Sequence, residues 1–163
     1  MTISIVDYTT YADIRAALGV SAKELPDETI ALDLYSSNLE LELYDLDSTA
    51  QASYNTLVTK TTPSAAESRF VAAAKFFAIY CVARHLTTTM PIFAPRQISD
   101  GKASVVRFDN PYRDTIASVN QMYDLSRNRL TDALGAIGTT VATKVSLNYL
   151  GVVTPDYDPV TNE

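Results

Sequence analysis

The two residues best suited to nucleophilic chemistry share one face of a predicted helix. Cys81 and His85 are four residues apart, the spacing that could pair a thiol with a general base, and they are the chain's single cysteine and single histidine. Tyr80 and Val82 flank the cysteine, which is typical of a buried, inert thiol. The histidine lies near the end of its helix, where the last carbonyls attract a positive charge. We therefore expect structural roles for both.

The other residues that could bind a cation or act in catalysis are four carboxylates: Glu40, Glu42, Asp45 and Asp47. A calcium loop needs a glycine for its sharp turn, and residues 20–100 contain none. On a helix these acids spread around the surface, so we expect a solvated acidic face. The chain also lacks a P-loop, a dinucleotide glycine fingerprint and a second cysteine or histidine for a metal site. We expect no metal, no cofactor and no enzymatic activity.

The composition is that of one globular domain with room for an arm. The chain has 163 residues, of which 47% are apolar and 20% charged, and its net charge is −6. An acidic chain is poorly suited to wrapping nucleic acid, because phosphate binding depends on clustered Lys and Arg. The first residues lack a signal-peptide pattern, and the longest apolar stretch, 70–86, is too short to span a bilayer. We expect a soluble protein made in a reducing cytoplasm, without membrane contact.

Glycine and proline placement predicts the elements that carry these residues. Residues 27–62, 64–90 and 112–134 contain neither, and both residue types break helices. The predicted fold class is mainly α: a small bundle with one short helix over 10–18 and three long helices over 28–47, 64–88 and 111–134. The apolar stripe of the second helix consists of Leu32, Tyr35, Leu39, Leu43 and Leu46. The third is apolar around most of its circumference and is predicted to be central.

Start and stop signals accompany these helices. Thr10 with Asp13, and Ser64 with Glu67, have capping-box spacing. The other predicted signals are Gly19 as the end of the first helix, Asp27 as the N-cap of the second, Asn110 and Pro111 at the start of the fourth, and Gly135 as its end. Leu39, Phe77 and Val119 are predicted core residues.

Residues 91–110 are predicted to form a loop or β-hairpin that projects from a helical domain over 1–138. Asp100-Gly101 is a favoured pair for a tight hairpin turn, and Val105, Val106 and Phe108 favour strand. The loop is longer than a simple helix connection requires, which favours a function. Its basic residues suit an acidic partner surface: Arg96, Lys102 and Arg107. A floppy surface loop is the alternative.

Residues 139–163 are predicted to form an extended C-terminal arm. Polar residues alternate with an apolar set, which gives one apolar face: Val141, Val145, Leu147 and Tyr149. This face predicts strand addition to the sheet of a partner. The alternative is that the segment folds back on the 96–108 hairpin of its own subunit.

Charge is unevenly distributed along the chain. Residues 24–59 contain eight acids and no base, whereas residues 60–113 contain eight bases and three acids. One interpretation is that two helices have solvated faces of opposite sign. The other is that these faces meet between copies, and a head-to-tail contact of unlike surfaces closes into a ring.

The order of segments over residues 8–134 is distinctive. YADIRAALGV at 11–20 is followed by ELPD at 24–27, a long acidic Leu-rich helix, a helix ending near Leu86, the loop ISDGK at 98–102, a further helix and an extended arm. This order resembles the head–tail adaptor (connector) proteins of tailed bacteriophages. The resemblance rests on helix lengths and turn positions rather than on a catalytic signature.

The resemblance implies a structural role in the virion neck, at the head–tail junction. Adaptors of this kind are helical bundles that form a ring, commonly of twelve copies, beneath the portal protein. The ring extends the DNA channel and offers a surface for tail or nozzle proteins. An acidic lumen would let DNA pass without specific binding, because it repels phosphate. The alternatives are another neck or tail-completion protein (stopper or terminator), or a non-viral helical partner-binding domain.

Overall fold

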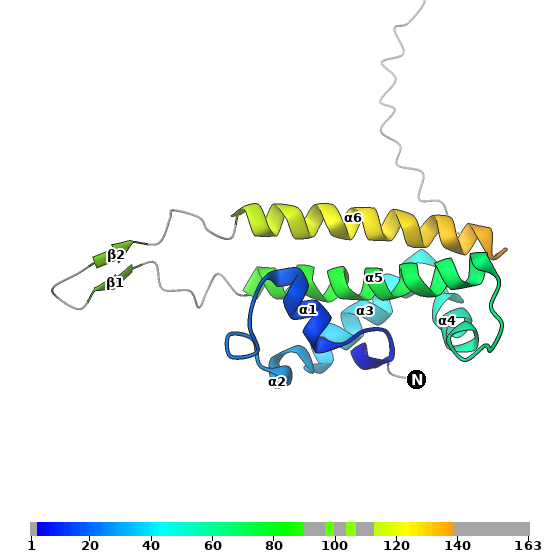
Figure 1. The fold of residues 1–163 in the computed structure, drawn as a ribbon, viewed down its shortest axis with the longest axis horizontal. Helices are drawn as coiled ribbons and strands as arrows, with labels where there is room; N and C mark the ends of the chain where they lie inside the picture. The colour runs from blue at the N-terminus through cyan, green and yellow to red at the C-terminus, as the bar shows by residue number, and fades with distance from the viewer. Residues whose placement is uncertain (1–2, 90–96, 100–103, 107–112, 139–163) are drawn as a thin grey trace, which may run out of the picture.

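The described part of the chain is mainly helical, which confirms the predicted class. The computed structural model describes residues 3–89, 97–99, 104–106 and 113–138 (Figure 1). Its helices are η1 (Ile5–Asp7), α1 (Tyr11–Leu18), α2 (Asp27–Ile30), α3 (Asp33–Leu46), α4 (Ala50–Val58), α5 (Ala65–Thr89) and α6 (Arg113–Ala136). The predicted helix over 10–18 corresponds to α1, the one over 64–88 to α5, and the one over 111–134 to α6.

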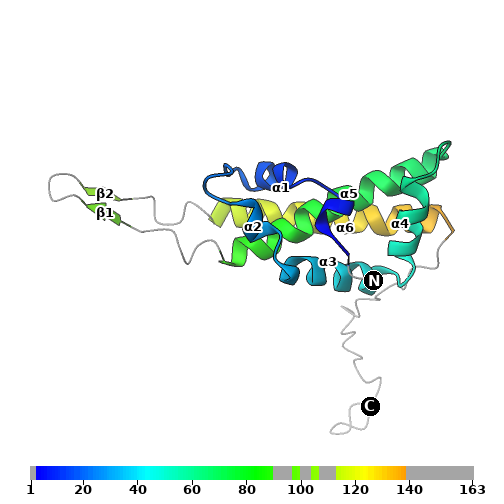
Figure 2. The same ribbon diagram turned by 90° about the horizontal axis from the view of Figure 1, so that it is seen from below.

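Helix α5 is the centre of the bundle. It runs antiparallel to α6, and α1, α3 and α4 all pack against it. Figure 2 shows α1 and α3 at opposite edges of the domain, with α5 and α6 between them. The central position predicted for the 64–88 helix is therefore confirmed.

The interior consists of two apolar clusters. The larger joins Ile3 and Tyr8, which flank η1, to helices α3 to α6 around Leu39, Phe77 and Leu130. The smaller joins η1, α1, α2, the start of α3, the C-terminal part of α5 and the N-terminal part of α6 around Ile14 and Val119. The three predicted core residues are all buried, with at most 2% of their surface exposed. Because α5 contributes to both clusters, it connects them along its length.

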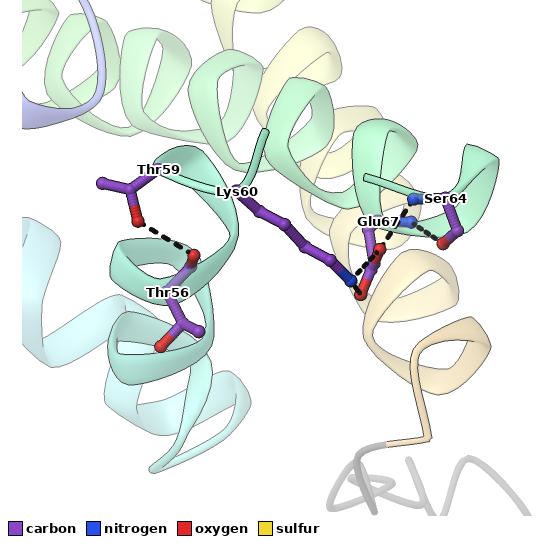
Figure 3. Close-up of polar contacts among 5 residues, drawn as sticks. All are labelled: Thr56, Thr59, Lys60, Ser64 and Glu67. Carbon is purple, nitrogen blue, oxygen red and sulfur yellow. Dashed lines mark hydrogen bonds and ion pairs between the residues drawn. The ribbon is translucent and has the colours of Figure 1, made fainter. Parts of the chain in front are cut away.

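Capping interactions fix the starts of α1 and α5. The Thr10 hydroxyl donates to Asp13 Oδ2 (2.7 Å), and the Asp13 N–H donates to the Thr10 hydroxyl (3.2 Å), so the predicted capping box is confirmed. Figure 3 shows the second box, in which the Ser64 N–H donates to Glu67 Oε2 (2.7 Å) and the Glu67 N–H to Ser64 Oγ (3.3 Å). Lys60 Nζ adds an ion pair to Glu67 (2.7 Å). These contacts set the turn from α4 into α5.

The predicted helix over 28–47 is wrong in its continuity. It is divided into α2 and α3 at Leu32, whose backbone is extended (φ −60°, ψ 135°). In one continuous helix Ile30 and Leu39 would lie on opposite sides, because nine residues at about 100° each give about 180°. The break lets both be fully buried, in different clusters, and it leaves Leu32 51% exposed. Leu32 therefore does not belong to the buried stripe, whereas the other four predicted members do.

Helix α4 is an element that sequence reasoning missed. Asp47 ends α3 in an extended conformation (φ −160°, ψ 126°), and its carboxylate accepts from the N–H and hydroxyl of Thr49, both at 2.6 Å. This local side-chain contact competes with helix continuation and starts a new helix. The bundle thus has six α-helices in its described residues rather than four.

Three predicted boundaries need correction or lie outside the described residues. Asp27 is the first residue of α2, and its N-cap is Pro26. Gly135 lies inside α6, and the positive φ of 86° that follows the helix belongs to Gly138. The proposed caps at 110 and 111 lie outside the described residues.

Two short strands, β1 (Gln97–Ser99) and β2 (Ser104–Val106), pair antiparallel in the register Gln97↔Val106 and Ser99↔Ser104. In both views they lie off the end of the bundle at which α5 ends and α6 begins (Figures 1 and 2). The proposed turn at 100–101 lies outside the described residues, as do the segments joining the strands to the helices. A functional projecting hairpin therefore stays a prediction.

Candidate interaction surfaces

The predicted interface residues lie outside the described part of the chain. This holds for the basic loop residues Arg96, Lys102 and Arg107, and for the arm residues Val141, Val145, Leu147 and Tyr149. Their contact roles stay predictions, and the search for a site turns to the described helices.

Cys81 and His85 do not form an activated pair. Cys81 is fully buried, and burial raises the pKa of its thiol to about 12. Burial also lowers the pKa of His85. Both effects favour the neutral forms, whereas a nucleophilic pair requires thiolate and imidazolium. The predicted burial of Cys81 is confirmed, and its lack of reactivity stays a prediction. The proposed contact of His85 with helix-end carbonyls is not seen, because its Nε2 is buried without a hydrogen-bond partner among the described residues.

Polar contacts near this pair connect three helices. The Tyr123 hydroxyl of α6 donates to Glu42 Oε2 of α3 (2.6 Å). Arg84 of α5 lies over the Tyr123 ring, with its guanidinium carbon 4.3 Å from the ring centroid. Burial and the Glu42 carboxylate raise the pKa of the Tyr123 hydroxyl, which stays protonated as a donor. These groups therefore hold the bundle together.

The acidic residues of α3 and its C-terminal end do not converge. Glu42 is bound by Tyr123, Asp47 binds Thr49, and Asp45 is exposed. Within the described residues, no group of three or more His, Cys, Asp or Glu side chains is arranged to hold a metal ion. Glu42, Asp45 and Asp47 therefore lie at separate positions on α3 or at its C-terminal end and do not form a shared site.

One candidate surface, the α3 stripe, is defined by Leu34, Leu41 and Tyr44. These side chains are 60–67% exposed. Their spacing of seven and three residues puts them on one face of α3, and the buried Leu39, Leu43 and Leu46 occupy the other. Three large apolar side chains in a row on an exposed face are typical of an interaction surface.

The other candidate surface, the α5 groove, is a hollow of about 430 Å³ between η1, the start of α1, α4 and α5. Its exposed apolar side chains are Val6, Val58 and Phe76, which are 44–57% exposed. The stripe and the groove together hold six of the eight large exposed apolar side chains in the described residues. Exposed apolar surface is therefore concentrated in these two places.

Two stacked tyrosines form part of the groove wall. The Tyr8 and Tyr54 rings lie 4.2 Å apart between centroids, and the Tyr54 hydroxyl donates to the Asp7 carbonyl (3.1 Å). Burial raises the pKa of both hydroxyls. Because both rings are almost fully buried, the wall is preformed rather than flexible.

Helix α3 is acidic, whereas the groove lining carries both signs, with Lys75 beside Asp7 and Asp13. Helix α3 contains four acids and no base: Asp33, Glu40, Glu42 and Asp45. The outer side of α5 presents two exposed bases, Lys75 in the groove and Arg69 seven residues before Phe76. The single acid of α5, Glu67, is already paired with Lys60. The excess of acids is thus a property of α3, and the exposed bases lie on α5.

The stripe could have been found from the sequence, since Leu34, Leu41 and Tyr44 have helical spacing outside the predicted buried stripe. The groove could not, because it joins residues from three separate stretches of the chain, 6–13, 54–58 and 72–79. The sequence also does not distinguish the adjacent Phe76, which is half exposed, from Phe77, which is buried.

Helix α5 is long and apolar enough, by length and composition alone, to cross a membrane. However, 56% of its most apolar window is buried inside the bundle. The central helix of a bundle has the same length and composition, and that role accounts for its apolar residues here.

Comparison with protein-family models, curated proteins and solved structures finds no match to this chain, so its function is argued from its own residues.

Proposed function

We propose that this protein is a head–tail adaptor of a tailed bacteriophage, a structural virion protein without enzymatic activity. Its copies form a ring, of about twelve subunits by resemblance to such adaptors, beneath the portal in the virion neck. The ring extends the DNA channel and provides the surface to which tail or nozzle proteins attach. DNA passes through the lumen without specific binding, because a net charge of −6 on every copy disfavours phosphate contacts.

The observation that supports this proposal most strongly is the presence of two separate exposed apolar surfaces, the α3 stripe and the α5 groove, on one small helical bundle. A monomer that acts alone has no need of two such surfaces. A subunit that contacts two neighbours through unlike surfaces needs both, and repeated unlike contacts close into a ring. The order of the segments, which resembles that of adaptors, supports the same function.

The hairpin region and the arm supply the contacts with other proteins in this proposal. The basic residues of the 91–110 loop face an acidic surface of a neighbour or tail protein. The arm adds a strand to a sheet of the portal through main-chain hydrogen bonds and its apolar face. Ordering of the arm upon binding links attachment to the presence of the portal.

The test is to locate and count the protein in purified particles. Gold-labelled antibody against the chain should mark the neck, and quantitative mass spectrometry should give a ratio to portal near one. The full-length chain should also bind isolated portal rings of the same phage. Particles that contain no copy would refute the proposal and favour a non-viral partner-binding domain. A neck protein that binds another ring but not portal would instead be a stopper or terminator.

A further inference from the structure

We propose that the α3 stripe binds a basic amphipathic helix of another protein, and that this contact attaches a tail or nozzle protein to the ring. The partner helix carries apolar residues at heptad positions a and d, and Lys or Arg at the flanking positions e and g. The inference rests on the proposed function for the identity of the partner, because it names the surface and the chemistry of tail attachment.

The stripe has the spacing of a coiled-coil seam. Leu34 and Leu41 are seven residues apart and occupy two successive a positions, and Tyr44 occupies the d position that follows. The d position between the two leucines is the small, exposed Ser37. The buried residues of α3 occupy positions b, c and f instead: Tyr35, Ser36, Leu39, Leu43 and Leu46. Helix α3 therefore packs into its own bundle on one side and presents a second seam on the other.

The dimensions of the seam fit a helix as the partner. Ten residues separate Leu34 from Tyr44, which corresponds to a rise of about 15 Å along α3. A helix that packs alongside α3 contacts all three apolar side chains of the stripe with about three of its own turns. Figure 2 shows α3 at one edge of the domain, where a neighbour can lie along it.

Charge determines which helix fits. The positions that flank the seam are acidic, with Asp33 and Glu40 at g and Asp45 at e. Helix α3 contains no base, and neither Asp33 nor Glu40 forms an ion pair among the described residues. In coiled coils the e and g residues of one helix pair with those of the other and so select the partner. Lys or Arg at these positions complements α3, whereas the α3 of a second copy would place acid against acid.

The two parts of the surface have different roles in binding. Contact with the seam removes leucine and tyrosine surface that is 60–67% exposed from water, which provides the affinity. The flanking carboxylates contribute little energy each, because they are solvated, but they exclude an acidic helix.

Two synthetic helical peptides test this chemistry on the full-length chain. Both contain four heptads with Ile at a and Leu at d; one has Lys at every e and g position, and the other has Glu. Fluorescence anisotropy should show that the Lys peptide binds at least tenfold more tightly than the Glu peptide, and that added salt weakens its binding. Equal binding of the two peptides, or no binding of the Lys peptide, would overturn the inference.

Variants of the chain locate the contact, since a basic peptide could also adhere to an acidic protein elsewhere. Leu41→Ser and Glu40→Lys should each weaken binding of the Lys peptide at least fivefold. The matched control Leu125→Ser, which changes an exposed leucine of α6 outside the stripe, should bind as the wild type does. Equal binding by Leu41→Ser and Leu125→Ser would overturn the inference.

The fold of the Leu41→Ser variant is checked by circular dichroism and thermal melting. Both should match the wild type, because the Leu41 side chain is 64% exposed. A large fall in the melting temperature would mean that Leu41 packs within its own chain, which contradicts the inference.

Photo-crosslinking identifies the partner in particles. A photoreactive maleimide is attached to the Leu41→Cys variant, in which the native Cys81 is fully buried, and the labelled chain is assembled with heads and tails of the same phage. Mass spectrometry should find the link on a tail or nozzle protein, in a segment whose apolar residues are three and four apart and flanked by Lys or Arg. A link to the portal or to another copy of this chain would overturn the inference.

The outcomes separate this inference from the proposed function. Normal attachment of tails to rings of Leu41→Ser or Glu40→Lys would overturn the role of the stripe and leave the adaptor proposal intact. Absence of the wild-type chain from particles would overturn the adaptor proposal, and the tail or nozzle protein as partner with it. The peptide measurements use the isolated chain and decide the chemistry of the stripe in either case.

Discussion

Replacing Tyr123 by phenylalanine tests whether the contact between α6 and α3 stabilises the bundle. The substitution removes one hydroxyl, which donates to Glu42 Oε2 at 2.6 Å, and keeps the ring, which packs 5.7 Å from Phe77 and beneath Arg84. A hydrogen bond to a charged group contributes about 1.5–3 kcal/mol, and partial exposure of this carboxylate reduces the expected loss to about 1–2 kcal/mol. For a chain of this size the melting temperature should fall by roughly 2–8 °C.

The assay is chemical unfolding followed by circular dichroism, with Glu42→Gln and the double variant completing a thermodynamic cycle. The expected coupling energy is about 1 kcal/mol. Tyr44→Phe is the matched control, because Tyr44 is 67% exposed, and its change should stay within about 0.5 kcal/mol. The pKa of Tyr123 is raised in the folded state, so the stabilisation is fully present below about pH 10 and is lost as pH rises further.

Two results would contradict this reasoning. One is an additive cycle, in which the double variant loses the full sum of the two single losses, whereas a coupled pair loses about 1 kcal/mol less than that sum. The other is equal destabilisation by Tyr123→Phe and Tyr44→Phe. Either result would mean that the contact between the Tyr123 hydroxyl and the Glu42 carboxylate adds nothing to the free energy of unfolding beyond the packing of the Tyr123 ring.

Four further predictions concern the helical core, the end of α1, the buried thiol and the C-terminal arm. Phe77→Ala should cost about 3–5 kcal/mol in chemical unfolding, since Phe77 is fully buried, and an unchanged melting temperature would contradict its central position. Gly19→Ala should cost about 1–2 kcal/mol, because Gly19 ends α1 at φ 68° in the left-handed region. Cys81 should resist a disulfide reagent at pH 8 until the protein is unfolded, whereas rapid labelling would show an accessible thiol. Truncation after Gly138 should preserve helical content and melting behaviour but abolish portal binding; lower stability with retained binding would instead place the arm in its own subunit's fold.

Helices were predictable here where local signals and burial pointed to the same boundary. The capping boxes at Thr10 and Ser64, and the left-handed glycine at position 19, are decided within a few residues of each helix end. The long apolar helix had to be central because most of its circumference is apolar. Once these helices were predicted, the burial of Leu39, Phe77 and Val119 could be predicted from their positions on the apolar faces.

The errors arose where tertiary packing decided the boundary. The break at Leu32 exists because Ile30 and Leu39 must face two different clusters, a demand that no local motif expresses. The break at Asp47 did have a local signal, since Asp47-Ser48-Thr49 is a cluster of turn-forming residues inside an otherwise uninterrupted helical window. The groove joins residues from 6 to 79 and depends on the whole arrangement.

The position of α5 in both apolar clusters has a consequence for how the bundle folds. Residues 70–81 belong to the larger cluster and residues 82–86 to the smaller, so a single helix spans the boundary between them. If either cluster loosens, α5 loses packing contacts, and the other cluster depends on the same helix. Neither cluster is therefore an independent unit of unfolding. The domain should consequently lose its structure in one cooperative transition, with the slowest amide exchange along α5, and partly unfolded subunits should be rare during assembly.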